Sequence, residues 1–169
     1  MVLKVDSPQI VHKSDAGGVK VGVEPADVAW EFQSMVETLR NAQPEAEING
    51  IRVQEMVDGE EVIVGLNRDP QFGPLIMFGL GGIYVEVMKD VSFRVAPVSS
   101  RHAREMVESI NGYPILEGVR GNEGVDVDSL VEIVQRVSQF AVDQPEIEEL
   151  DLNPIIASED DAREADVRF

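Results

Sequence analysis

Chemically useful side chains gather near the start of the chain, in the segment IVHKSDAGGV that runs from Ile10 to Val19. It places His12 beside a lysine, a serine, an aspartate and two glycines, and three of the four lysines fall within the first twenty residues. In a strongly acidic protein, a local excess of cations indicates an anion site, such as one for phosphate. A neutral histidine there could accept a phosphoryl group or act as a base. The alternative is an ordinary solvated polar loop.

A second group of candidates lies near the end of the chain, in ELDLNP (149–154) and ADVRF (165–169). If each segment is a strand, its side chains alternate between two faces, so Asp151 and Asn153 share one face. Asp166 and Arg168 share a face by the same rule. Pairing of the two strands would create a surface rich in carboxylate and amide oxygens, the donors that Mg²⁺ prefers. The alternative is a solvated acidic edge.

A third candidate is Lys4, which stands between apolar residues in the strand-like opening MVLKV. A strand lysine in this setting either reaches a phosphate or extends its head group to solvent. The glycines of DAGG (15–18) and GLGG (79–82) would let backbone amides approach an anion. Neither matches the GxxxxGK[ST] or GxGxxG pattern. His102 stands among arginines in a predicted helix, and we expect it to be an ordinary surface residue.

Composition narrows the class of protein. A length of 169 residues suits one domain or two small lobes, and 43% hydrophobic residues are typical of a globular chain. No apolar run approaches the roughly 20 residues of a membrane span, and the N-terminus lacks the pattern of a signal peptide, so we expect a cytoplasmic protein. Cysteine is absent, which removes disulfides and thiolate chemistry. The net charge of −18 argues against a nucleic-acid partner and indicates a halophile.

Strands and helices alternate along the chain. Apolar runs predict strands, two of them joined as a hairpin, at 1–5, 19–23, 51–57, 60–69, 73–80 and within 83–97. Helical periodicity predicts one helix that opens at 24–27, one from Ser99–Ser100 to about Gly112, and one from Asp128 to about Asp143. Residues 147–157 and 163–169 form a terminal hairpin in this interpretation. The predicted class is α+β with mixed or antiparallel sheets.

Taken in order, these segments resemble a known family. VLKVDSPQIVHKSDAGGVKVGV, VQEMVDGEEVIVGLNRDPQFGPLIMFGLGGIYVEVMKDVSFRVAP, ELDLNP and ADVRF are similar to the ATP-grasp domain of ADP-forming acetyl-CoA synthetases, also called NDP-forming acyl-CoA or acetate–CoA ligases. The resemblance covers essentially the whole chain. It implies an enzyme subunit that exchanges a phosphoryl group between ADP or ATP and a phosphohistidine on a CoA-binding alpha subunit. The expected assembly is a hetero-oligomer. The succinyl-CoA synthetase β-subunit is a related alternative.

The resemblance also implies roles for particular residues. Lys4 would contact nucleotide phosphates, His12 would carry a phosphoryl group transiently, and Glu61 would lie near the ribose. The hinge around the adenine would consist of Glu55, Met56 and Val57. The two positions that bind Mg²⁺ would be Asn153 and Asp166, with Asp151 as an outer partner.

The chain departs from the family pattern at its N-terminus, where the family domain normally begins earlier. We therefore expect residues 1–169 to be a partial ATP-grasp domain, with 1–57 as the remainder of the first lobe and 58–169 as the second lobe. A fragment, a late start codon and a naturally short subunit are the possible explanations. A non-catalytic module that senses nucleotide or docks a partner is the alternative function.

Overall fold

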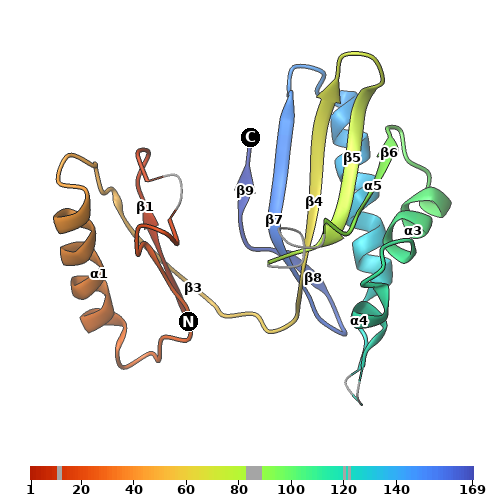
Figure 1. The fold of residues 1–169 in the computed structure, drawn as a ribbon. Coiled ribbons are helices and arrows are strands. Elements are labelled where there is room, and N and C mark those ends of the chain that lie inside the picture. Colours follow the sequence, from red (N-terminus) through yellow and green to blue (C-terminus); the bar gives the residue numbers. More distant parts are fainter. Residues whose placement is uncertain (11–12, 83–88, 120, 122) are drawn as a thin grey trace. The chain divides into compact units, whose positions relative to one another are not determined.

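The computed structural model describes residues 1–169 except 11–12, 83–88, 120 and 122. The chain divides into two compact units, Met1–Val57 and Asp58–Phe169, which are drawn in Figure 1. Each unit has its own hydrophobic core.

The first unit is a small antiparallel sheet with one helix. Strands β1 (Val2–Asp6), β2 (Val19–Lys20) and β3 (Gly50–Gln54) lie in the order β2-β1-β3. Helix α1 (Val28–Ala42) contributes the buried Met35 and Leu39 to the core of this unit. Leu3 and Val5 join that core, so alternation along β1 turns Lys4 to the opposite face of the sheet.

The second unit is built on a six-stranded sheet. Its strands are β4 (Glu60–Asp69), β5 (Gly73–Leu80), β6 (Val91–Val95), β7 (Glu149–Ala157), β8 (Ala162–Glu164) and β9 (Val167–Arg168). The order is β6-β5-β4-β7-β8, and β9 also pairs with β7. All the pairings are antiparallel. The longest strands, β4, β5 and β7, therefore form the middle of the sheet (Figure 1).

Helices cover one face of this sheet. Helices α3 (Ser100–Glu108), α4 (Tyr113–Glu117) and α5 (Val127–Asp143) supply most of the helical side of the core (Figure 1). From β4, the fully buried Val62, Val64 and Leu66 point into it. Within the described residues no helix packs against the other face, which we call the open face. No helix in the described part of the chain is long and apolar enough to cross a membrane.

Arg68 ties the end of α5 to the sheet. Its Nε donates to the carbonyl oxygen of Ile147 at 2.8 Å, and its Nη2 donates to the carbonyls of Ala141 at 2.5 Å and Gln144 at 3.0 Å. The last carbonyls of a helix have no partner within the helix. A single side chain from β4 therefore satisfies the end of α5 and fixes the turn that leads into β7.

The α+β class with antiparallel sheets and the β4–β5 hairpin are confirmed, but several element ends differ from the predicted ones. Strand β3 stops at Gln54, before the predicted end at Val57. The helix predicted to run to Gly112 ends at Glu108 and is followed by the separate helix α4. The buried Asp90 carboxylate explains this break, because it accepts hydrogen bonds from the backbone of Asn111 and Gly112 and turns the chain away.

Asp126 caps the N-terminus of α5. Its carboxylate accepts hydrogen bonds from the backbone amide of Ser129 at 3.2 Å and from its hydroxyl at 2.6 Å. The hydroxyl bond above all lowers the pKa of Asp126 below its ordinary value of 3.8. The stabilisation is therefore present above the unfolded-state pKa and is lost as pH falls through the folded-state pKa.

We expect Asp126→Ala to lower the free energy of unfolding at pH 7 by about 1 kcal/mol. Urea unfolding followed by circular dichroism at pH 7 and at successively lower pH measures this effect. Asp126→Asn, which keeps an acceptor oxygen, is the control and should lose less. A difference between wild type and Asp126→Ala that stays constant into strong acid would contradict the role of the charge.

Candidate functional site

The candidate site in the second unit lies where β7 pairs with β9. Asp151 stands opposite Arg168 and Leu152 opposite Val167. The backbone amide of Asn153 then donates to the carbonyl oxygen of Asp166 at 3.1 Å. The terminal strands thus pair as the sequence predicts, and Asn153 and Asp166 are neighbours in the sheet.

These polar side chains project from the open face. On β7, Leu150 lies opposite Leu66 and Leu152 opposite Val64, both of which point into the helix-covered core. Alternation places Asp151 and Asn153 on the other side. Residues directly across an antiparallel pair share a face, so Arg168 and Asp166 join them there. We call Asp151, Asn153 and Asp166 the oxygen cluster.

A β-bulge occurs at the oxygen cluster. The pairing of β4 with β7 shifts between Val62 and Val64, because Val62 faces Ile155 whereas Val64 faces Leu152. The extra residue of β7 lies at Asn153–Pro154, whose peptide bond is cis. A bulge bends its strand and re-aims the adjacent side chains. Here it keeps Asn153 on the open face while both Leu152 and the fully buried Ile155 reach the core.

Charges of both signs meet at this cluster. The Nε atom of Arg168 lies 3.7 Å from Oδ2 of Asp166. Burial raises the pKa of Asp151 above its ordinary value. The side chain of Asn153 and the guanidinium of Arg168 oppose that rise, whereas the Asp166 carboxylate adds to it. Two carboxylates so placed repel each other, and a cation between them would relieve the repulsion.

The donor set fits a hydrated Mg²⁺ ion. It consists of two carboxylates and one amide, all oxygen donors, whereas Mg²⁺ commonly keeps several waters and takes few protein ligands. Among the described residues, no group of three or more His, Cys, Asp or Glu side chains could hold a metal alone. The oxygen cluster could therefore complete a shell that phosphate oxygens and water share.

Glu61 lies on β4 and contacts the glycine turn that follows β5. The amide of Gly81 donates to the carbonyl oxygen of Glu61 at 2.6 Å. A Cβ atom on Gly81 would stand 2.9 Å from Cβ of Glu61, closer than real contacts allow. The glycine is thus required for this approach. Glu61 alternates with the buried Val62, so it projects from the open face that carries the oxygen cluster.

Two cations face each other in the first unit. Lys4 on β1 lies directly opposite Arg52 on β3, on the same face of the small sheet. The Nη2 atom of Arg52 lies 3.6 Å from Oδ2 of Asp6. Like charges directly across a strand pair repel each other, and the Asp6 carboxylate offsets part of this repulsion. Sequence reasoning missed Arg52, because only the long-range pairing of β1 with β3 places it beside Lys4.

The segment around His12 is only partly described, and His12 itself lies outside the described residues. On one side of it, Ile10 is buried in the core of the first unit. On the other side, the amide of Gly18 donates to the carbonyl of Lys13, and the amide of Val5 donates to Gly18, both at 2.7 Å. The DAGG segment therefore lies beside β1, and its hydrogen-bond partner there is Val5, the residue that follows Lys4.

Glu55, Met56 and Val57 follow the end of β3 and lead to the boundary between the two units. Met56 is 46% exposed although its side chain is apolar. The predicted contacts of this segment with adenine stay a prediction. The structure brings Asp151, Asn153 and Asp166 together within the second unit, whereas Lys4 belongs to the first.

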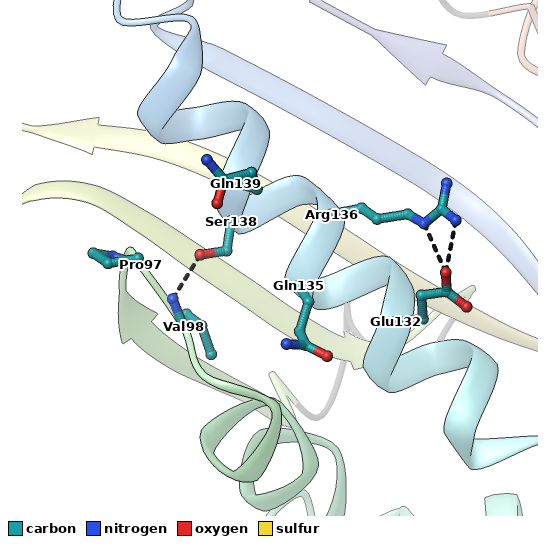
Figure 2. A pocket seen from close by; sticks show the side chains of 7 residues that line it. All are labelled: Pro97, Val98, Glu132, Gln135, Arg136, Ser138 and Gln139. Atoms are coloured by element: carbon teal, nitrogen blue, oxygen red, sulfur yellow. Dashed lines mark hydrogen bonds and ion pairs between the residues drawn. The ribbon is translucent and has the colours of Figure 1, made fainter.

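A separate hollow of about 300 Å³ lies between α5 and residues 97–98 (Figure 2). It contains none of the predicted site residues. The residues that line it include the ion pair of Arg136 with Glu132, and Ser138, whose hydroxyl accepts a hydrogen bond from the amide of Val98 at 2.7 Å. These polar groups already satisfy one another, so the hollow is a weaker candidate than the open face. His102 is exposed on α3, and its backbone amide donates to the hydroxyl of Ser99, which caps that helix.

Comparison with known proteins places the whole chain in one group. The ATP-grasp domain family matches residues 1–169. The chain is 50% identical over 171 residues to "Acetate--CoA ligase [ADP-forming] I subunit beta" of Pyrococcus furiosus, which covers 100% of this chain and 74% of that subunit. It is 52% identical to "Acetate--CoA ligase [ADP-forming] I" of Archaeoglobus fulgidus, over 92% of this chain and only 23% of that longer protein.

Solved structures agree with the sequence matches. A dinucleotide-forming acetyl-coenzyme A synthetase 1 of Ca. Korarchaeum cryptofilum, in complex with coenzyme A and Ca-AMPCP, superposes with a TM-score of 0.93 at 46% identity. The match covers 98% of this chain and 73% of that one. Another structure of that synthetase contains Mg-AMPPCP, with its phosphohistidine segment pointing towards the nucleotide binding site.

Proposed function

The chain belongs to the ATP-grasp family of ADP-forming acetate–CoA ligase beta subunits, and on this basis we propose that it is the nucleotide-binding part of such a ligase. It would transfer a phosphoryl group between ADP or ATP and a phosphohistidine on a partner alpha subunit. The assembled enzyme interconverts acyl-CoA, ADP and phosphate with acid, CoA and ATP. The observation that carries the proposal is the oxygen cluster on the open face, at the positions that the family resemblance assigns to metal binding.

The proposed roles follow from the charges of the residues. Asn153 and Asp166 would bind Mg²⁺, with Asp151 as an outer partner that holds Asn153 through their hydrogen bond. A bound Mg²⁺ would supply positive charge to the phosphate oxygens during transfer. Lys4 would contact the phosphates, and Arg52 stands beside it with a second positive charge. Glu61 would lie near the ribose, and the adenine contacts would come from Glu55, Met56 and Val57.

We interpret the two units as lobes of one ATP-grasp domain. Residues 1–57 would belong to the first lobe and residues 58–169 to the second lobe. His12 would take the phosphoryl group transiently and pass it between nucleotide and partner. The alpha subunit that carries the phosphohistidine would also bind CoA, so this chain would be inactive alone and act within a hetero-oligomer.

The metal assignment predicts a specific loss of nucleotide binding. The substitution Asp166→Asn replaces a carboxylate of the metal site by a neutral amide. We therefore expect the affinity for Mg-ADP to fall at least about tenfold. Calorimetric titration of the full chain with Mg-ADP in molar KCl measures it. Asp160→Asn is the matched control, because it removes an equal charge from an exposed turn. Equal affinities for Mg-ADP in wild type and Asp166→Asn would remove Asp166 from the metal site.

The role of His12 predicts that binding and transfer can be separated. His12→Asn should bind Mg-ADP as wild type does, but it should not carry the phosphoryl group between nucleotide and partner. The measurement is acyl-CoA-dependent ATP formation with the alpha subunit present, with His102→Asn as the matched control. Full activity of His12→Asn would show that the phosphoryl group passes directly between the nucleotide and the alpha subunit, without His12.

We further propose that the chain works in a salt-rich cytoplasm, as in a halophile. At a net charge of −18, self-repulsion opposes folding, and screening shortens from about 10 Å at 0.1 M to about 3 Å at 1 M salt. We expect the unfolding temperature to rise by at least about 4 °C between 0.1 and 2 M KCl. Scanning calorimetry measures this temperature, with sucrose as the uncharged control. An unfolding temperature that does not rise with KCl would exclude salt adaptation.

A further inference from the structure

Arg168 is a charged residue beside the oxygen cluster, and the family resemblance assigns it no role. It lies on β9 directly opposite Asp151, and its Nε stands 3.7 Å from Oδ2 of Asp166. Its side chain is 51% exposed, whereas that of Asp166 is 26% exposed. The guanidinium therefore reaches the outer side of the cluster and remains accessible to solvent.

The guanidinium of Arg168 lies where it would repel a divalent cation bound to the oxygen cluster. Mg²⁺ and Arg168 would compete for the same oxygen of Asp166, and their charges would repel each other at such short range. The distance between the two groups is too long for a close hydrogen bond and the guanidinium is half exposed, so the ion pair contributes little free energy. A guanidinium that leaves a carboxylate keeps the donor geometry that suits phosphate oxygens.

We propose that Arg168 acts as a stand-in cation for the metal site. Without metal it neutralises Asp166 and Asp151 and keeps the cluster from repelling itself. When a divalent cation and nucleotide bind, Arg168 leaves Asp166 and donates to a phosphate oxygen. This inference rests on the proposed nucleotide function and adds a phosphate-binding residue to it.

The competing explanation is a plain surface ion pair. The neighbouring strand β8 offers such a pair for comparison, because Nε of Arg163 lies 2.9 Å from Oδ2 of Asp161. Both arginines are more than half exposed, and both lie within two residues of their partner. Arg163 faces Ile156 on β7, away from the Asn153–Asp166 pairing. Arg163→Met is therefore a matched control for Arg168→Met.

The first half of the test measures divalent cation binding without nucleotide. Mn²⁺ titration followed by electron paramagnetic resonance reports the free ion directly. Because Arg168→Met removes the competing charge, we expect it to bind Mn²⁺ roughly three- to tenfold more tightly than wild type. Arg168→Lys, which keeps the charge, and Arg163→Met should bind as wild type does. If Arg168→Met and wild type bind Mn²⁺ equally, or if neither binds it, Arg168 does not compete with a divalent cation for Asp166.

The second half measures Mg-ADP and Mg-ATP binding by calorimetry on the same proteins. Here Arg168→Met should bind about tenfold more weakly, because it has lost a charge-assisted bond to phosphate. The opposite signs are the signature of the proposal, since local damage to the site would weaken both kinds of binding. Thermal unfolding of each variant verifies that the fold is intact.

The outcomes separate this inference from the function on which it rests. If wild type binds no Mg-ADP, the proposed function fails, and the phosphate contact of Arg168 fails with it. If wild type binds Mg-ADP and Arg168→Met binds it equally well, the function stands and the phosphate contact is wrong. Stronger Mn²⁺ binding together with weaker Mg-ADP binding supports both.

Discussion

The single extra residue in β7 is the constraint on which the rest of the second unit depends. A strand that alternates without interruption cannot point both Leu152 and Ile155 into one core, because the two residues are three positions apart. The bulge at Asn153–Pro154 resolves this conflict, and both side chains pack under the sheet. The bulge leaves Asn153 on the open face. The same irregularity that completes the core therefore places the amide of Asn153 beside the carboxylates of Asp151 and Asp166.

Each unit carries charged side chains of both signs on one face of its sheet. The second unit places Asp151 and Asp166 on paired strands with Arg168 beside them. The first unit places Lys4 opposite Arg52, which lies near Asp6. In each unit a neighbouring opposite charge offsets the repulsion between like charges. Carboxylates suit a divalent cation, and cationic side chains suit phosphate oxygens.

Much of this arrangement could be read from the sequence, and the rest required long-range pairing. Alternation in ELDLNP was enough to predict which side Asp151 and Asn153 share, and the apolar runs predicted the β4–β5 hairpin. The bulge has no local signal except the spacing of Leu152 and Ile155. The position of Arg52 opposite Lys4 depends on strand pairing across more than forty residues of chain. The break after α3 depends on the distant carboxylate of Asp90. The role of His12 stays a prediction.

The hydrogen bonds of Arg68 couple the end of α5 to the start of β7. One guanidinium holds the carbonyls of Ala141 and Gln144 at the end of the helix. The same guanidinium holds the carbonyl of Ile147, two residues before β7 begins. Arg68 itself lies on β4, the strand that pairs with β7. The strand that carries Asp151 and Asn153 therefore shares its anchorage with a helix on the covered side of the sheet, and loosening of that helix end would reach the strand through a single side chain.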